Sequence, residues 1–91
     1  MNIPQITSID AALQIYYNYS EIGNKELIEL FGRISSATIA KLKRAVKDEM
    51  YKRDILSYGL YKVNTAVAFA VFGIDAVDLE KRRKKLKDLE L

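Results

Sequence analysis

The sequence predicts an all-α fold of about five helices, in which a tri-helical core is followed by further C-terminal helices. Two observations lead to this prediction. Apolar residues recur along five segments at the spacing of one helix face, and the four glycines and the single proline fall where that spacing is interrupted. The composition, 49% hydrophobic and 30% charged over 91 residues, is typical of one globular domain spanning residues 1–91.

Two short helices are predicted near the N-terminus. The first covers residues 8–19, and Thr7 together with Asp10 resembles a capping box at its start. The second covers residues 25–31 and has Asn24 as its N-cap. The buried side of the second helix is predicted to carry four apolar residues, Leu27, Ile28, Leu30 and Phe31.

The third helix is predicted to begin at Ser35 or Ser36, either of which can cap it, and to continue to about residue 56. Its buried face recurs at helical spacing and contains Ile39, Leu42, Val46 and Met50. The segment 60–63 that follows is either one short extended strand or a loop, because no hairpin partner is evident nearby.

The C-terminal part of the chain, about residues 64–90, is predicted to form a pair of helices. The first, over residues 65–72 with Asn64 or Thr65 as its cap, is apolar on nearly every side. We therefore expect it to be the most buried element. The second helix follows Asp75, which can act as its N-cap. Its apolar stripe consists of Leu79, Leu86 and Leu89.

Basic residues are concentrated in the C-terminal half. Residues 1–40 contain two basic and four acidic side chains, whereas residues 41–91 contain 13 basic and eight acidic ones. This asymmetry suits a polyanionic partner, but an ordinary solvated helix surface can have the same composition. The net charge of +3 does not separate these two interpretations.

The absence of cysteine and histidine excludes several kinds of site. No disulfide framework, thiolate metal site or imidazole base can form, and the acidic residues show no constellation of their own. We therefore expect no enzyme activity, catalytic residue, metal, cofactor or small-molecule substrate. No apolar run approaches the roughly 18 residues of a membrane span, and the start does not resemble a signal peptide. These features predict a cytoplasmic protein without a membrane partner.

Residues 24–47 contain the pattern of a short helix, a glycine turn and a second helix with basic residues on its outer side. The apolar, turn and capping positions of this pattern are Phe31, Gly32, Ile34, Ser35, Ile39 and Leu42. The pattern resembles the helix-turn-helix of bacterial and phage DNA-binding proteins, whose second helix commonly sits in the major groove. Arg33 makes the turn one residue longer than in the commonest version of the motif.

The resemblance implies that the start of the third helix would contact double-stranded DNA. Small residues there permit close approach, while Lys41 and Arg44 can reach guanine or the backbone. Basic residues of the last helix could contact phosphates as well, or could form a solvated face. The candidate DNA-binding residues are Arg33, Ser35, Ser36, Thr38, Lys41, Arg44, Lys81, Arg82 and Lys85.

A partial repetition of the motif occurs later in the chain. Phe72 and Gly73 end one apolar helix, an isoleucine follows, and Asp75 opens a basic helix. This repetition is either a degenerate second helix-turn-helix or a second use of the same way to end one helix and begin another.

The sequence favours sequence-dependent DNA binding by a small prophage-like or mobile-element regulator, with transcription regulation as its process and a homodimer as its assembly. Two alternatives remain open. A phage DNA-packaging adaptor, similar to small terminase subunits, places a helix-turn-helix before a helical oligomerisation segment, and residues 64–90 could be that segment. A protein-interaction or structural module could use the same fold without DNA.

Overall fold

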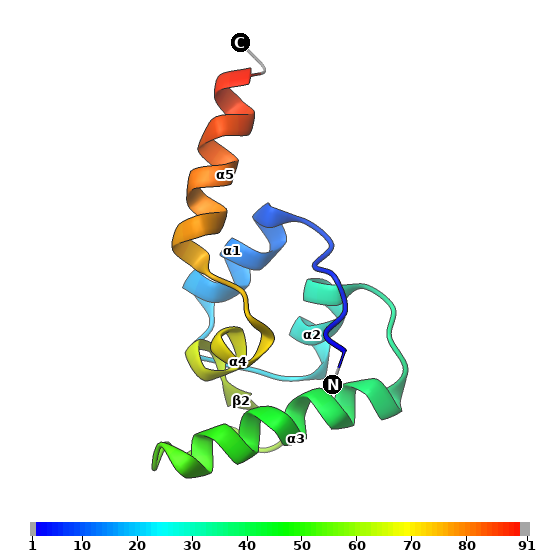
Figure 1. Cartoon of the computed structure of the whole chain (residues 1–91). Coiled ribbons are helices and arrows are strands. Elements are labelled where there is room, and N and C mark those ends of the chain that lie inside the picture. The colour runs from blue at the N-terminus through cyan, green and yellow to red at the C-terminus, as the bar shows by residue number, and fades with distance from the viewer. Residues whose placement is uncertain (1, 90–91) are drawn as a thin grey trace.

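The computed structural model describes residues 2–89, in which five helices surround one hydrophobic core (Figure 1). The helices are α1 (Ile9–Asn18), α2 (Asn24–Phe31), α3 (Ser36–Lys52), α4 (Thr65–Phe72) and α5 (Ala76–Leu89). Two very short strands, β1 (Glu21–Ile22) and β2 (Val63–Asn64), pair in antiparallel. The predicted all-α class is confirmed. Residue 90, at the end of the predicted C-terminal pair, lies outside the described residues.

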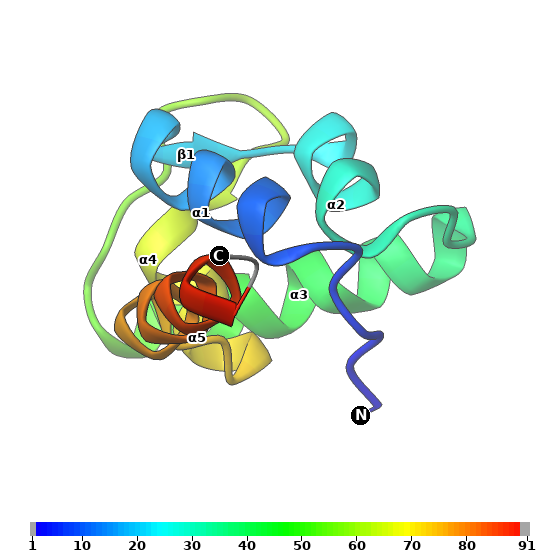
Figure 2. The same cartoon turned by 90° about the horizontal axis from the view of Figure 1, so that it is seen from above.

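The helices α3 and α5 lie at opposite ends of the molecule. In Figure 1, α3 runs along the lower side, while α5 packs against α1 and points away from α3. Seen from above, α5 is viewed nearly end-on and α3 lies across the view (Figure 2). The C-terminal half of α5 therefore extends beyond the other helices, and the molecule is elongated, with extents of 44 × 27 × 22 Å.

Phe69 of α4 is the largest of the fully buried side chains, with 1% exposure. Its ring packs against Tyr16 of α1, and the two ring centroids are 5.1 Å apart. A second aromatic pair, Phe31 of α2 and Phe72 of α4, has centroids 5.3 Å apart. These pairs connect α4 to both α1 and α2. The largest fully buried aliphatic side chains are Leu13, Ile22, Leu27, Leu30, Leu42, Val46, Val63 and Val67.

Two helices begin with a different cap from the one predicted. Ser8 caps α1 through its hydroxyl, because the hydroxyl of Thr7 donates instead to a carbonyl near the end of α2. The N-cap of α2 is Gly23, whose N–H donates to the carboxylate of Glu26 at 2.8 Å. Asn24 therefore lies inside the helix rather than before it. Of the alternatives predicted for α3 and α4, the structure shows Ser35 and Asn64 as the caps, and the predicted cap of α5, Asp75, is confirmed.

Helix burial agrees with the prediction on α3 and α4 and differs from it on α2 and α5. The predicted inner face of α3 is buried, namely Ile39, Leu42, Val46 and Met50. On α2, however, Ile28 is 43% exposed, because only one side of this helix faces the core. On α4, five of the eight residues are buried, the largest share of any helix, which confirms the prediction that it is the most buried element; Ala66 and Ala70 are exposed. On α5, Leu86 and Leu89 are exposed because this half of the helix lies beyond the core.

The sequence allows either a strand or a loop for the segment 60–63. In the structure this segment ends in a strand with a distant partner. Val63 of β2 pairs with Ile22 of β1, which lies before α2 in the chain. The helix α3 ends at Lys52 rather than at residue 56. A loop over residues 53–62 then leads into β2. No nearby hairpin partner was evident because the partner strand is separated from β2 by two helices.

One carboxylate holds the loop 53–62 in place. Glu21 of β1 accepts hydrogen bonds from the backbone N–H groups of Tyr58, at 2.8 Å, and Gly59, at 2.7 Å. Partial desolvation of Glu21 opposes its ionisation, but these hydrogen bonds outweigh that effect and lower the pKa of its carboxyl group. The loop nevertheless exposes its large side chains, namely Leu56, Tyr58, Leu60 and Tyr61.

We predict that Phe69→Ala destabilises the fold by about 3–5 kcal/mol, because it removes a buried ring and leaves a cavity. The free energy of unfolding is measured by urea titration. The matched control is Val77→Ala on α5, where the side chain is 60% exposed and the expected change is within about 0.5 kcal/mol. Equal, small changes in the two variants would contradict the central position of α4.

We predict that the attachment of loop 53–62 weakens in acid. A carboxyl group whose pKa is lowered by folding contributes stability above its unfolded pKa and loses that contribution as the pH falls through the folded pKa. The amide proton shifts of Tyr58 and Gly59, followed by NMR, should therefore titrate with a midpoint below 4.5, the ordinary pKa of Glu21. Glu21→Gln should abolish this titration. A midpoint at or above 4.5 would contradict the prediction.

Candidate nucleic-acid interface

The turn before α3 is built by Gly32 and closed by Ser35. Gly32 has a φ of 82°, in the region that favours glycine, and the chain then passes through the exposed Arg33 and the half-buried Ile34. The hydroxyl of Ser35 accepts a hydrogen bond from the N–H of Thr38 at 3.1 Å. The extra residue that Arg33 adds is thus accommodated between the glycine and a well-formed N-cap.

A polar contact fixes α3 against the start of α2. Lys43 of α3 donates from Nζ to Oδ1 of Asn24 at 3.0 Å. Burial of the amine, and to a smaller extent the neighbouring Lys47, lowers the pKa of Lys43. Asn24, which the sequence suggested as an N-cap, instead links two helices. Lys43 is therefore a structural residue on the side of α3 rather than part of its free outer surface.

The outer face of α3 combines small and basic side chains. Its exposed members, which we call the α3 face, are Ala37, Ala40, Lys41, Arg44, Lys47 and Asp48. Neither Lys41 nor Arg44 makes a side-chain hydrogen bond or ion pair with any residue in the range 2–89. Both line a surface hollow of about 580 Å³ along α3, which also contains Asn2 from the start of the chain. The face thus offers three cations without such a partner among residues 2–89, namely Lys41, Arg44 and Lys47, beside two alanines.

The serines and threonine at the start of α3 have different surroundings. The hydroxyl of Ser35 is used by the N-cap and also lies 2.9 Å from the hydroxyl of Thr38. Ser36 is exposed, and its hydroxyl has no hydrogen-bond partner among the described residues. Of the three hydroxyl groups predicted to contact DNA, only that of Ser36 is thus not already engaged in a hydrogen bond within the described residues.

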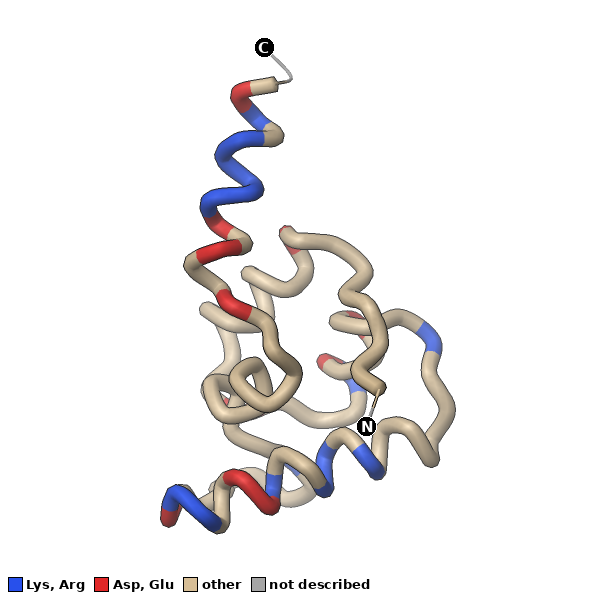
Figure 3. Tube along the Cα trace, viewed as in Figure 1, with Lys and Arg blue, Asp and Glu red and all other residues tan. Residues whose placement is uncertain are grey.

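The basic residues of α5 lie apart from the α3 face. Figure 3 shows the basic residues of α5 on the half of that helix that points away from α3. Arg82 forms an ion pair with Asp78 one turn earlier, at 2.9 Å, whereas Lys81 and Lys85 are exposed. The structure therefore does not bring these three predicted site residues together with Lys41.

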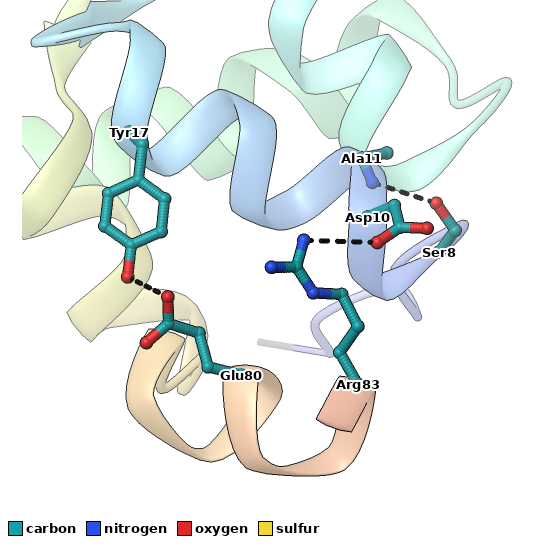
Figure 4. A network of polar contacts seen from close by, with 6 residues as sticks. All are labelled: Ser8, Asp10, Ala11, Tyr17, Glu80 and Arg83. Carbon is teal, nitrogen blue, oxygen red and sulfur yellow. Dashed lines mark hydrogen bonds and ion pairs between the residues drawn. The ribbon is translucent and has the colours of Figure 1, made fainter. Parts of the chain in front are cut away.

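Two polar contacts connect α5 to α1 (Figure 4). The hydroxyl of Tyr17 donates to Oε1 of Glu80 at 2.7 Å, and Arg83 lies 3.5 Å from Asp10. The hydrogen bond to Glu80 is the main reason why the pKa of Tyr17 is raised. Sequence reasoning missed both contacts, because the partners are far apart in the chain and only their helix positions could have suggested them.

The repetition at Phe72 and Gly73 does not extend to the backbone. Gly73 is left-handed, with φ 71° and ψ 25°, whereas Gly32 has φ 82° and ψ −161°. The two glycines therefore direct the chain differently after their helices. This difference argues against a degenerate second helix-turn-helix. It favours the other interpretation, in which similar residues end one helix and begin another at two places in the chain.

The part of the chain that the structure describes contains no cluster of three or more potential metal-ligating residues. None of its helices has the length and apolar character needed to cross a membrane. Comparisons of the chain with protein families, curated proteins and solved structures give no match.

We predict that Ser35→Ala lowers the free energy of unfolding by about 1 kcal/mol, because it removes the N-cap hydrogen bond of α3. The control is Ser36→Ala, which removes the neighbouring exposed hydroxyl and should change stability by less than about 0.5 kcal/mol. Urea unfolding of the two variants checks this difference. Equal decreases would show that Ser35 has no special structural role.

Proposed function

We propose that the protein binds double-stranded DNA in a sequence-dependent manner through the α3 face, as a small regulator of phage or mobile-element type. One observation carries this proposal. Lys41 and Arg44 are exposed neighbours on α3, and neither has a hydrogen-bond or ion-pair partner among residues 2–89. Free cations on a rigid helix are available to neutralise phosphates and release their counterions.

The surroundings of these cations suit the close approach of a duplex. Ala37 and Ala40 precede and flank Lys41 on the exposed side of the helix, so their small side chains leave room for base edges or the sugar-phosphate backbone. The N-terminal end of α3 also carries a partial positive charge from the aligned peptide dipoles. Arg33, exposed in the turn just before that end, adds a further cation for a flanking phosphate.

Acidic residues confine the proposed contact to the first part of α3. Asp48 lies one turn after Arg44 on the exposed side, and Glu49 pairs with Arg53 near the end of the helix at 2.9 Å. The carboxylate of Asp48 repels phosphate, so the favourable region lies before Asp48, from Arg33 to Lys47. A contact region of this size is small, which is why we also propose that a homodimer binds two half-sites.

The packaging-adaptor alternative is favoured by one observation on α5. The C-terminal half of this helix extends from the body and exposes Leu86 and Leu89, as an oligomerisation segment would. Light scattering of the purified protein separates the two roles. A ring-sized oligomer supports the adaptor, whereas a monomer or dimer supports the regulator.

We predict that Lys41→Ala combined with Arg44→Ala weakens binding to duplex DNA by roughly 1–3 kcal/mol. The slope of log affinity against log salt should also become shallower, by about 0.9 for each phosphate that the variant no longer neutralises. Both side chains are exposed, so the thermal midpoint should hardly change. Fluorescence anisotropy with a labelled mixed-sequence duplex, at two salt concentrations, measures both effects.

The matched control is Lys81→Ala combined with Lys85→Ala, which removes the same charge from α5 and should affect binding far less. Equal weakening in both double variants would show general attraction by net charge rather than binding through α3. Absence of binding by the unaltered protein at roughly 50 mM salt, where phosphate contacts are strong, would refute the proposal.

A further inference from the structure

The start of the chain is fixed against α2 before α1 begins. Thr7 donates from its backbone N–H to the carbonyl of Leu30 and from its hydroxyl to the carbonyl of Glu29, both at 2.8 Å. These carbonyls belong to the last turn of α2, which has no partners within the helix for them. Ile3 and Ile6 pack against the core. The N-terminal segment, residues 2–7, is thus held by both polar and apolar contacts.

This attachment brings the first described residue to the candidate interface. Asn2 is exposed and lines the hollow of about 580 Å³ together with α3 residues. In Figure 1 the segment descends from α1 towards α3. The α3 residues that line the hollow are Thr38, Lys41, Leu42, Arg44, Ala45 and Asp48. One wall of the hollow therefore comes from the N-terminal segment and the other from the proposed DNA-binding helix.

The chemistry of the hollow is uneven along its length. Lys41 and Arg44 provide cationic donors, and the amide of Asn2 provides two neutral N–H donors. Asp48, one turn beyond Arg44, provides a carboxylate that repels anions. The hydroxyl of Thr38 is already within hydrogen-bond distance of Ser35. The hollow thus brings hydrogen-bond donors from the N-terminal segment and from α3 together, and these donors can bind an anion.

We propose that Asn2 is a further DNA-contacting residue, whose amide donates a hydrogen bond to a backbone phosphate that Lys41 or Arg44 neutralises. This inference rests on the proposed function and adds a second segment of the chain to the interface. The N-terminal segment contacts the strand at the edge of the groove that α3 faces. Because phosphate contacts fix the register of a protein on its duplex, Asn2 acts in positioning α3 rather than in reading bases.

The test places a negative charge at two positions of the same segment. Asn2→Asp and Gln5→Glu both lower the net charge by one, and both side chains are exposed, but Gln5 does not line the hollow. Salt screens a charge more strongly the farther it lies from the phosphate, so the position that does not line the hollow should matter less. We expect Asn2→Asp to weaken binding to the mixed-sequence duplex at least about fivefold, and Gln5→Glu less than about twofold.

A neutral variant identifies the kind of contact. Asn2→Ala should weaken binding while leaving the salt slope unchanged, because a neutral donor releases no counterion. Thermal midpoints of all three variants are measured alongside, and unchanged midpoints show that the segment stays folded.

If the unaltered protein binds DNA and loses affinity with Lys41→Ala, while Asn2→Asp and Gln5→Glu behave alike, the inference about Asn2 is wrong and the proposed function stands. If the unaltered protein fails to bind, both are wrong.

Discussion

The candidate interface depends on the burial of the inner face of α3. Leu42 and Val46 are completely inaccessible, and Ile39 and Met50 are nearly so. Because these four side chains recur at helical spacing, the whole length of α3 is attached to the core by one side. The opposite side is then exposed along its length, whatever residues it carries. Burial therefore orients Lys41 and Arg44 outward without any polar contact of their own.

Contacts between distant segments fix the structure around α3. The strands β1 and β2 connect the entry of α2 to the entry of α4, and Glu21 beside them attaches the loop that follows α3. On the other side, Thr7 attaches the N-terminal segment to the end of α2. Lys43 and Asn24 then link α2 to α3. These polar contacts add to the apolar packing of Ile3, Ile6 and Ile22 in holding the segments that border the exposed face of α3.

The sequence is sufficient to predict those features of the fold that depend on the spacing of nearby residues. The inner stripe of α3, its Ser35 cap and the start and end of α4 follow from residues within one or two helical turns, and the structure confirms them. The errors arise where a polar residue has a distant partner. Thr7 and Asn24 look like caps, yet each contacts another helix. Periodicity also identified Leu86 as apolar, but it could not show that α5 extends beyond the core.

Local sequence also cannot show how the basic charge is distributed over the folded molecule. The excess of basic residues after residue 40 is a property of the sequence, but the fold divides it between two helices that point in different directions (Figures 1 and 3). On α5, Arg82 and Arg83 are further engaged with Asp78 and Asp10. A straight duplex lying along α3 would leave the outer half of α5 without contact, since that half lies at the opposite end of the molecule. In the proposed function, the charge available to one DNA molecule would therefore be much smaller than the sequence total, and affinity would come from the few free cations of α3 and from the segments that border it.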